Sequence, residues 1–127
     1  MKSTYLTLMP DILKSNSSEP FPTKLSIKIA KLNKELEDNL SIYKTVLNQL
    51  VDNYVKKDEN GKPMIEEDGT VTLKENCADQ WRKEYGDLEN SEFEFKTTFT
   101  EYELNLMKLT PLQAAVMMEL VKENSGD

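Results

Sequence analysis

Histidine is absent from this 127-residue chain, and the absence limits its chemistry more than any residue that is present. Imidazole is the usual general base near neutral pH and the commonest ligand of transition metals. Catalysis would have to rest on carboxylates, lysines, tyrosines or the single cysteine, Cys77. Because no motif gathers such groups, we expect a protein that is not an enzyme, and we assign no catalytic, cofactor-binding or metal-ligating residue.

Cysteine and long apolar runs are also scarce. One cysteine cannot form a disulfide within the chain, which points to a reducing compartment such as the cytoplasm. No apolar stretch approaches the roughly 18 residues that a membrane span requires, and no secretion signal is evident. The length favours a single domain, residues 1–127. The lack of a long apolar run favours a protein that is not in a membrane.

Arginine is nearly absent, since the chain has only Arg82 and a formal net charge of −7. Proteins that bind nucleic acids usually carry clustered arginines on a basic domain, so we expect no direct contact with nucleic acid. The basic excess follows one helical face at Lys24, Lys28, Lys31 and Lys34. We interpret this row as a solvated surface rather than a phosphate-binding stripe.

Residues 23–56 give the clearest structural signal. Apolar residues recur in steps of three and four without glycine or proline, which predicts one long amphipathic helix. The apolar stripe runs straight, so packing on a core is favoured over a coiled-coil seam. Ile27 and Ile42 lie on the opposite side of this helix, and we expect Leu13 or Phe21 to cover Ile27.

Alternating apolar and charged residues predict a small antiparallel sheet. Apolar residues occupy the odd positions from Phe93 to Phe99, as in a half-buried strand. Within residues 1–22 we expect a strand over 3–9 that pairs with it, then a short helix opened by Pro10 and a polar loop. A change of parity near Thr100 predicts a bulge, a bend or a new strand.

Residues 57–75 are predicted to form turns. Asn60-Gly61 and Asp68-Gly69 are both turn dipeptides, and we expect a small hairpin around the second. The segment partly fits a calcium-binding loop, but Lys56 occupies the first ligand position and would repel the metal. We therefore favour two turns over a calcium site.

Residues 76–127 are predicted to hold two helices besides the strand or strands. The first runs over about 76–86 and is expected to stop at Gly86. The second is announced by Thr110-Pro111-Leu112-Gln113, which combines an N-cap, a proline at the first helical position and a capping box. It is expected to reach about Lys122 and to bury Leu112, Ala115, Val116 and Leu120. The predicted class is therefore α+β, with one long amphipathic helix packed on a small antiparallel sheet and a C-terminal helix.

Three features are candidate contact or reactive positions, and each has a plainer explanation. Methionines near the C-terminus can form an adaptable binding surface, although such residues are more often core. Trp81 and Tyr85 are better interface candidates, but packing on the long helix is favoured. Cys77 is interpreted as a small buried hydrophobe. The apolar set near the C-terminus comprises Met107, Met117 and Met118 with Leu106, Leu109 and Leu112.

Over nearly its whole length the chain resembles a family of small uncharacterised proteins from tailed phages and prophages of Gram-positive bacteria. The matching segments are Phe21-Pro22-Thr23-Lys24-Leu25-Ser26-Ile27-Lys28-Ile29-Ala30-Lys31, Lys57-Asp58-Glu59-Asn60-Gly61-Lys62-Pro63, the Phe93–Phe99 segment and Leu109-Thr110-Pro111-Leu112. Phe21 departs from the pattern, which has leucine before the proline. The resemblance implies a phage origin and carries over no catalytic residue.

Two functions are compatible with these observations. The first is a non-enzymatic phage protein that acts through protein–protein contacts, as a minor structural, assembly or accessory factor, in the host cytoplasm or incorporated into the virion. The alternative is an acidic inhibitor of a host restriction or defence enzyme. Residues 58–127 hold seven basic and seventeen acidic side chains, a balance of −10, and carboxylates can imitate a phosphate backbone. The carboxylates in question are Glu92, Glu94, Glu101 and Glu103.

The apolar residues away from the predicted core bear on the oligomeric state. Ile27, Ile42, Trp81 and Tyr85 are more apolar surface than a thin domain readily covers. Two-fold pairing is the commonest way to bury such a patch, so a homodimer is favoured over a monomer.

Overall fold

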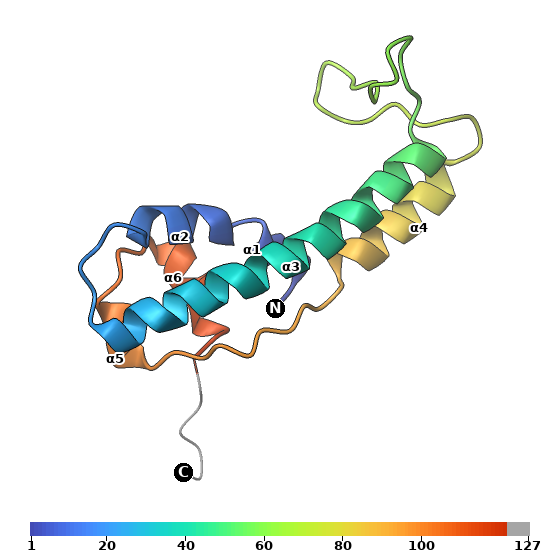
Figure 1. Cartoon of the computed structure of the whole chain (residues 1–127). Helices are drawn as coiled ribbons and strands as arrows, with labels where there is room; N and C mark the ends of the chain where they lie inside the picture. The colour runs from blue at the N-terminus through green and yellow to red at the C-terminus, as the bar shows by residue number, and fades with distance from the viewer. Residues whose placement is uncertain (122–127) are drawn as a thin grey trace. The chain divides into compact units, whose positions relative to one another are not determined.

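The computed structural model describes residues 1–121, which are built from helices and their connections (Figure 1). Helices make up 57% of these residues, and the β-structure is limited to isolated bridges without any strand. The predicted α+β class is therefore wrong for the described part of the chain. In order, the helices are α1 (Ser3–Leu6), α2 (Met9–Asn16), α3 (Thr23–Tyr54), α4 (Ala78–Glu89), α5 (Glu101–Asn105) and α6 (Pro111–Met118).

The chain forms two compact units. The first consists of Met1–Leu40 and the described residues from Glu92 onward, and the second is Ser41–Ser91. Helix α3 contributes to both, because none of its 32 residues is a glycine or proline that would break it. The predicted long helix is thus confirmed, and the single domain stays a prediction.

The N-terminal residues form helices where a strand was predicted over 3–9. Buried Leu6, Met9, Ile12 and Leu13 follow one another in steps of three, three and one, which is the spacing of a helical face. The β-propensity of the first residues is overridden by this pattern. The helix expected at Pro10 is confirmed, with the proline in the first turn of α2, where its missing N–H is tolerated.

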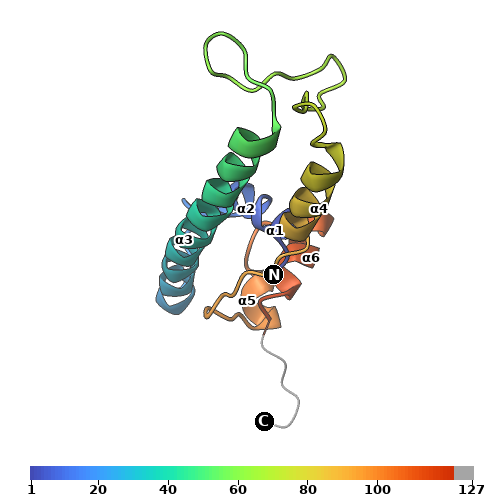
Figure 2. The same ribbon diagram turned by 90° about the vertical axis from the view of Figure 1, so that its right-hand side faces the viewer.

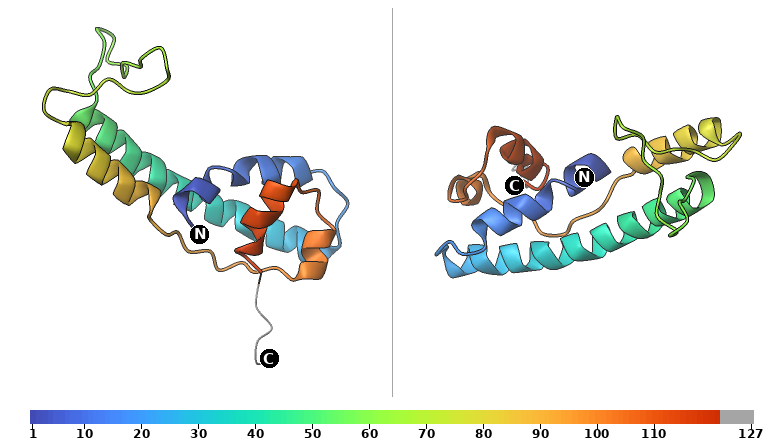
Figure 3. Two further views of the ribbon diagram at one scale, coloured as in Figure 1. Left: turned by 180° about the vertical axis from the view of Figure 1, so that it is seen from behind. Right: turned by 90° about the horizontal axis from the view of Figure 1, so that it is seen from above.

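In the first unit, α2 lies between α3 and α6 (Figures 2 and 3). The buried Asn16 side chain joins the end of α2 to the connection before α6. Its Nδ2 donates to the carbonyls of Ile12 (2.8 Å) and Lys108 (3.0 Å), and its Oδ1 accepts from the Lys108 N–H (2.8 Å). The largest fully buried apolar side chains of this unit are Leu6, Met9, Ile12, Leu25, Leu32, Phe99, Val116 and Met117.

The segment from Glu92 to Thr100 alternates in burial as predicted, but it belongs to no sheet. Phe93, Thr97 and Phe99 are buried, while the even-numbered residues are exposed. Only its ends form bridges, Glu92 with Lys2 and Phe99 with Val121. The predicted strand is therefore wrong, although the prediction of which side of the segment is buried and which is exposed was correct.

Side chains of α3 take the place of the missing neighbouring strand. The Glu35 carboxylate accepts hydrogen bonds from the N–H groups of Lys96 (2.5 Å) and Thr97 (3.0 Å) and from the Thr97 hydroxyl. The Asn39 Nδ2 donates to the Glu94 carbonyl (2.9 Å). Backbone groups that a ladder would have paired are thus satisfied by a helix.

Capping boxes begin both C-terminal helices. Thr100, near which a bulge, a bend or a new strand was predicted, is instead the N-cap of α5, and its box with Glu103 was missed. The predicted box of Thr110 and Gln113 at α6 is confirmed. Helix α6 ends at Met118, before the expected Lys122, which lies outside the described residues. Val116 and Leu120 are buried as predicted, whereas Leu112 and Ala115 are exposed.

In the second unit, α4 runs antiparallel beside the end of α3 (Figures 1 and 3). Gly86 lies inside α4, which continues to Glu89, so the predicted stop is wrong. Trp81 and Tyr85 are half-buried and stacked, with ring centroids 5.1 Å apart. Burial raises the pKa of Tyr43 on α3, and the neighbouring Tyr85 and Glu89 add to this, which agrees with the aromatic face of α4 packing toward α3.

Residues 55–77 between α3 and α4 form three successive turns, and we call this segment the three-turn loop. Three residues spaced eight apart close a ring of backbone hydrogen bonds. The Lys56 N–H donates to the Thr72 carbonyl (2.8 Å), and the Met64 N–H donates to the Lys56 carbonyl (2.8 Å). The Thr72 N–H donates to the Met64 carbonyl (2.9 Å) and closes the ring. The expected turn at Asp68-Gly69 is present, with Gly69 at φ 89° and a bridge between Ile65 and Val71.

Candidate protein-interaction surface

The described residues offer little that resembles a reactive centre. Within residues 1–121 no three or more His, Cys, Asp or Glu side chains gather as metal ligands. The Asp58 carboxylate, in the segment that partly fits a calcium-binding loop, accepts hydrogen bonds from the N–H groups of Asn60 (2.8 Å) and Lys62 (3.0 Å). Cys77 is half-buried just before α4. None of the helices in this range has the length and apolarity to span a bilayer.

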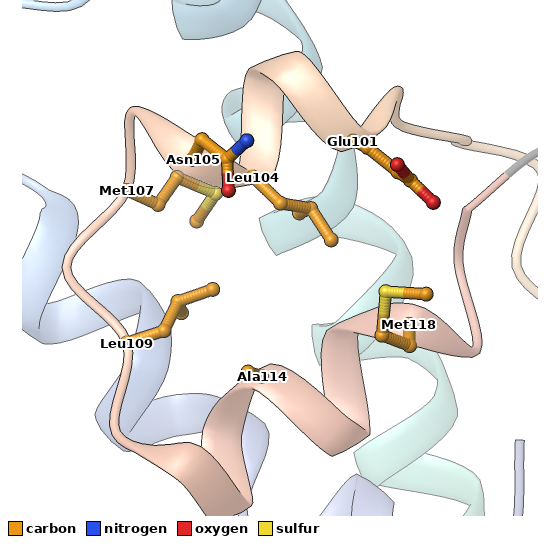
Figure 4. Close-up of a pocket in the computed structure, with 7 residues that line it drawn as sticks. All are labelled: Glu101, Leu104, Asn105, Met107, Leu109, Ala114 and Met118. Carbon is orange, nitrogen blue, oxygen red and sulfur yellow. The ribbon is translucent and has the colours of Figure 1, made fainter.

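A groove between α5 and α6, with a lining that is part apolar and part polar, is the first candidate surface. Its volume is about 340 Å³. Figure 4 shows Leu104, Leu109 and Met118 pointing toward the space between the two helices, with Glu101 at one end. The full lining is Glu101, Leu104, Asn105, Met107, Leu109, Ala114 and Met118, and we call this the α5–α6 groove.

The walls of the α5–α6 groove are held by local structure on both sides. Each helix starts at a complete capping box, and their connection is fixed because Asn16 bonds both backbone groups of Lys108. Val116 and Met117 anchor α6 in the core. The groove is therefore preformed, which lowers the entropic cost of binding a partner.

The predicted methionine-rich set divides between core and surface. Met107 and Met117 are buried, in line with the plainer interpretation. Met118 in the groove is 50% exposed and Leu112 on α6 is 57% exposed, so both are available to a partner. Tyr102 and Leu106 on or next to α5 are exposed as well. Several large apolar side chains near one groove are more than scattered single exposures.

Glu103 shows how α5 is tied to α3. Its carboxylate pairs with Lys28 Nζ at 2.6 Å and accepts from the Thr100 N–H at 2.9 Å. Partial burial alone would raise the pKa of Glu103, but the hydrogen bond and charge of Lys28, with the Thr100 bonds, hold it below its ordinary value. Lys28 also lies over the Phe99 ring, 5.8 Å from its centroid.

These contacts weaken the case for a row of exposed carboxylates. The Glu103 side chain is only 14% exposed and is neutralised by Lys28, while Glu92 pairs with the terminal ammonium of Met1 at 3.1 Å. Only Glu94 and Glu101 of the four are left exposed and outside the salt bridges of the described chain. A phosphate mimic would need a longer row.

A second groove has a cationic rim. It is lined by Lys28, Lys31, Lys34, Glu35, Asp38, Lys96, Thr97 and Thr98, has a volume of about 680 Å³, and is named the lysine groove. Three of the four residues of the row noted in the sequence therefore share it with Lys96.

Ile27 is not covered by the N-terminal segment, contrary to our expectation. It is 50% exposed in the described chain, and Ile42 is exposed too. About four turns of helix separate the two residues, and Lys31, Lys34 and Asp38 share their face of α3. The two isoleucines therefore form no continuous apolar patch.

The apolar set noted in the sequence includes Met107, Leu109 and Met118 of the α5–α6 groove, but it includes neither Leu104 nor the groove itself. The overlooked signal is Thr100-Glu101-Tyr102-Glu103, a threonine followed three residues later by glutamate, which announces a helix start. Recognising it would have placed a second helix before Thr110. No known protein family, curated protein or solved structure that was compared with the chain matches it.

Proposed function

We propose that this chain is a non-enzymatic protein of a tailed phage or prophage and that it acts by binding a partner protein through the α5–α6 groove. The observation that carries the proposal is the preformed groove with Met118 exposed in its lining. The phage origin rests on the resemblance described above. A protein that binds a partner and catalyses no reaction would serve as a minor structural, assembly or accessory factor.

The groove suits one or two apolar side chains of a short amphipathic helix or peptide. Thioether and leucine linings adapt to different apolar shapes, because methionine is unbranched and polarisable. Glu101 at one end of the groove is exposed and is not part of a salt bridge in the described residues, so a lysine or arginine on the partner would complement it.

Photo-crosslinking in cells that produce both the chain and its phage tests this proposal. A photoreactive phenylalanine analogue replaces Met118 in one variant and Ile27 in another. The two native side chains are equally exposed, at 50%, but only Met118 lines the groove. We expect one predominant phage or host protein crosslinked from position 118, and from position 27 no protein other than a second copy of this chain.

Two results would contradict the proposal. Equal crosslinking from both positions would show contact without a specific groove, and no protein adduct from position 118 would remove the groove as a binding surface. Mass spectrometry of purified virions then separates a particle component from an intracellular factor.

A further inference from the structure

An eight-residue pattern repeats three times over residues 55–78, which are the three-turn loop and the first residue of α4. The copies are Val55–Lys62, Pro63–Thr70 and Val71–Ala78, and each has glutamate at its fifth position. In every copy the N–H of the seventh residue donates to the carbonyl of the fourth. These bonds are Gly61 to Asp58 (3.0 Å), Gly69 to Glu66 (2.9 Å) and Cys77 to Lys74 (3.2 Å).

The copies also pair in a cycle. The third residue of each bridges to the first residue of the next, as Lys57–Pro63, Ile65–Val71 and, closing the cycle, Leu73–Val55. Together with the hydrogen-bonded ring of Lys56, Met64 and Thr72, this makes the loop a closed three-fold unit. Its turns are therefore presented in a fixed geometry.

The apolar residues at the start of the second copy are exposed, whereas those of the first and third copies are buried or half-buried. Val55 of the first copy is buried, and Val71 and Leu73 of the third are half-buried. Pro63, Met64 and Ile65 of the second are all exposed, with Ile65 at 64%. Glu66, Glu67 and Asp68 follow directly and are exposed too, and we call Met64–Asp68 the acidic tip. The fold itself gives no reason for an apolar pair at this position.

The lysine groove has the complementary chemistry. Within the described residues Lys31, Lys34 and Lys96 form no salt bridge, although the Lys96 charge acts on the Glu35 carboxylate, and Asp38 is the other carboxylate of the groove lining. The backbone N–H groups of Lys96 and Thr97 are already bound to Glu35. The groove thus offers ammonium groups and apolar lysine stems, which suit carboxylates beside an apolar side chain better than a phosphate.

We propose that the acidic tip of one molecule binds in the lysine groove of a second copy of this chain. The carboxylates of Glu66 and Glu67 meet Lys31, Lys34 and Lys96, and Ile65 lies against the lysine stems. Tip and groove are different surfaces, so this contact is heterologous and propagates head to tail unless it closes into a ring. It differs from the two-fold pairing through Ile27 that the sequence favoured.

Sedimentation equilibrium with three variants tests this contact. Glu67→Lys reverses a charge on the tip, and Glu59→Lys makes the same change at the equivalent position of the first copy. Lys31→Ala with Lys34→Ala removes two cations of the groove. For the wild type we expect an average mass above 14.6 kDa that rises with concentration and falls as salt increases from about 50 mM to about 500 mM.

The variants are expected to differ sharply. Glu67→Lys and the double alanine variant should each weaken self-association about tenfold or more, while Glu59→Lys changes it by less than about twofold. An equimolar mixture of Glu67→Lys with the double alanine variant retains one intact tip and one intact groove. It should therefore stop at a two-chain species.

Several outcomes would overturn the proposal. They are a wild type that stays at 14.6 kDa at all concentrations, an equal effect of Glu59→Lys and Glu67→Lys, and a mixture that remains monomeric. A dimer that persists in these variants but is abolished by Ile27→Lys would assign self-association to the back of α3 instead.

Discussion

Glu35 is the residue on which the unexpected part of the fold depends most. Its carboxylate receives three hydrogen bonds from Lys96 and Thr97 and so holds an extended segment on the first part of α3. Such a contact cannot be inferred from a linear sequence, because a glutamate among the charged residues of a long helix is ordinary. Hydrogen bonds between a side chain and backbone groups far along the chain leave no periodic pattern in the sequence, so they could not be predicted.

Replacing Glu35 by alanine should therefore lower the free energy of unfolding by about 1–2 kcal/mol, because charge-assisted bonds are lost and the Thr97 N–H is left unsatisfied. Glu37→Ala, an exposed glutamate of the same helix, is the matched control and should change it by less than about 0.5 kcal/mol. Urea denaturation measures both. Equal losses would show that Glu35 does no more than any glutamate on α3.

Glu35 and Glu103 also predict how stability responds to acid. Partial burial alone would raise the pKa of Glu35, but the Thr97 and Lys96 hydrogen bonds and the Lys96 charge lower it overall, and the pKa of Glu103 is lowered too. The unfolded chain then binds protons more tightly than the folded one. Stability from these groups is full above the ordinary glutamate pKa and is lost as pH falls below it through the folded values.

Denaturation midpoints between pH 7 and pH 3 measure this dependence. Glu35→Gln with Glu103→Gln should give a shallower decline below about pH 4.5 than the wild type, because the linked protons are gone. Parallel curves for the two proteins would mean that these carboxylates titrate alike in the folded and unfolded states.

At the scale of elements, the spacing of apolar residues predicted which face of a segment is buried better than it predicted which other segment packs against that face. The helical spacing of α3 and the Thr110-Pro111 start of α6 were read correctly, because both signals are local. Alternation over Phe93–Phe99 gave the correct buried side but not the absence of a neighbouring strand. The expected partner, residues 3–9, follows a helical spacing into α1 and α2. The three-fold pattern of the three-turn loop was present in the sequence as an eight-residue period and was overlooked.

Replacing glycine by alanine is expected to have opposite effects on stability in the three-turn loop and in α4. Gly61 and Gly69 have φ of 79° and 89°, where a side chain is strained, so alanine at either should cost about 1 kcal/mol of stability. Gly86 lies inside α4 with no neighbouring atom in the way of a Cβ. Gly86→Ala should therefore stabilise by about 0.5–1 kcal/mol. Thermal unfolding of the three variants checks the sign, and destabilisation by Gly86→Ala would contradict the helical assignment.

At the scale of the whole molecule, the sequence predicted the composition of the candidate site but not its shape. Met107, Leu109 and Met118 were recognised as apolar residues near the C-terminus, yet nothing local distinguishes a groove from a core. The distinction arises because Met117 faces inward while its neighbour Met118 is exposed. It depends on where α5 ends and how Asn16 fixes the following turn, and both require the folded chain.

The proposed contact at the α5–α6 groove is tested most directly by a comparison of dissociation constants. The protein crosslinked from position 118 is purified and titrated with Met118→Lys and with Ile27→Lys. Lysine at position 118 removes an apolar contact and competes with a cation of the partner for Glu101, so it should raise Kd at least about tenfold, or about 1.4 kcal/mol, while lysine at the equally exposed position 27 changes Kd by less than about twofold. Equal constants for the two variants, or a larger loss from Ile27→Lys, would contradict the account.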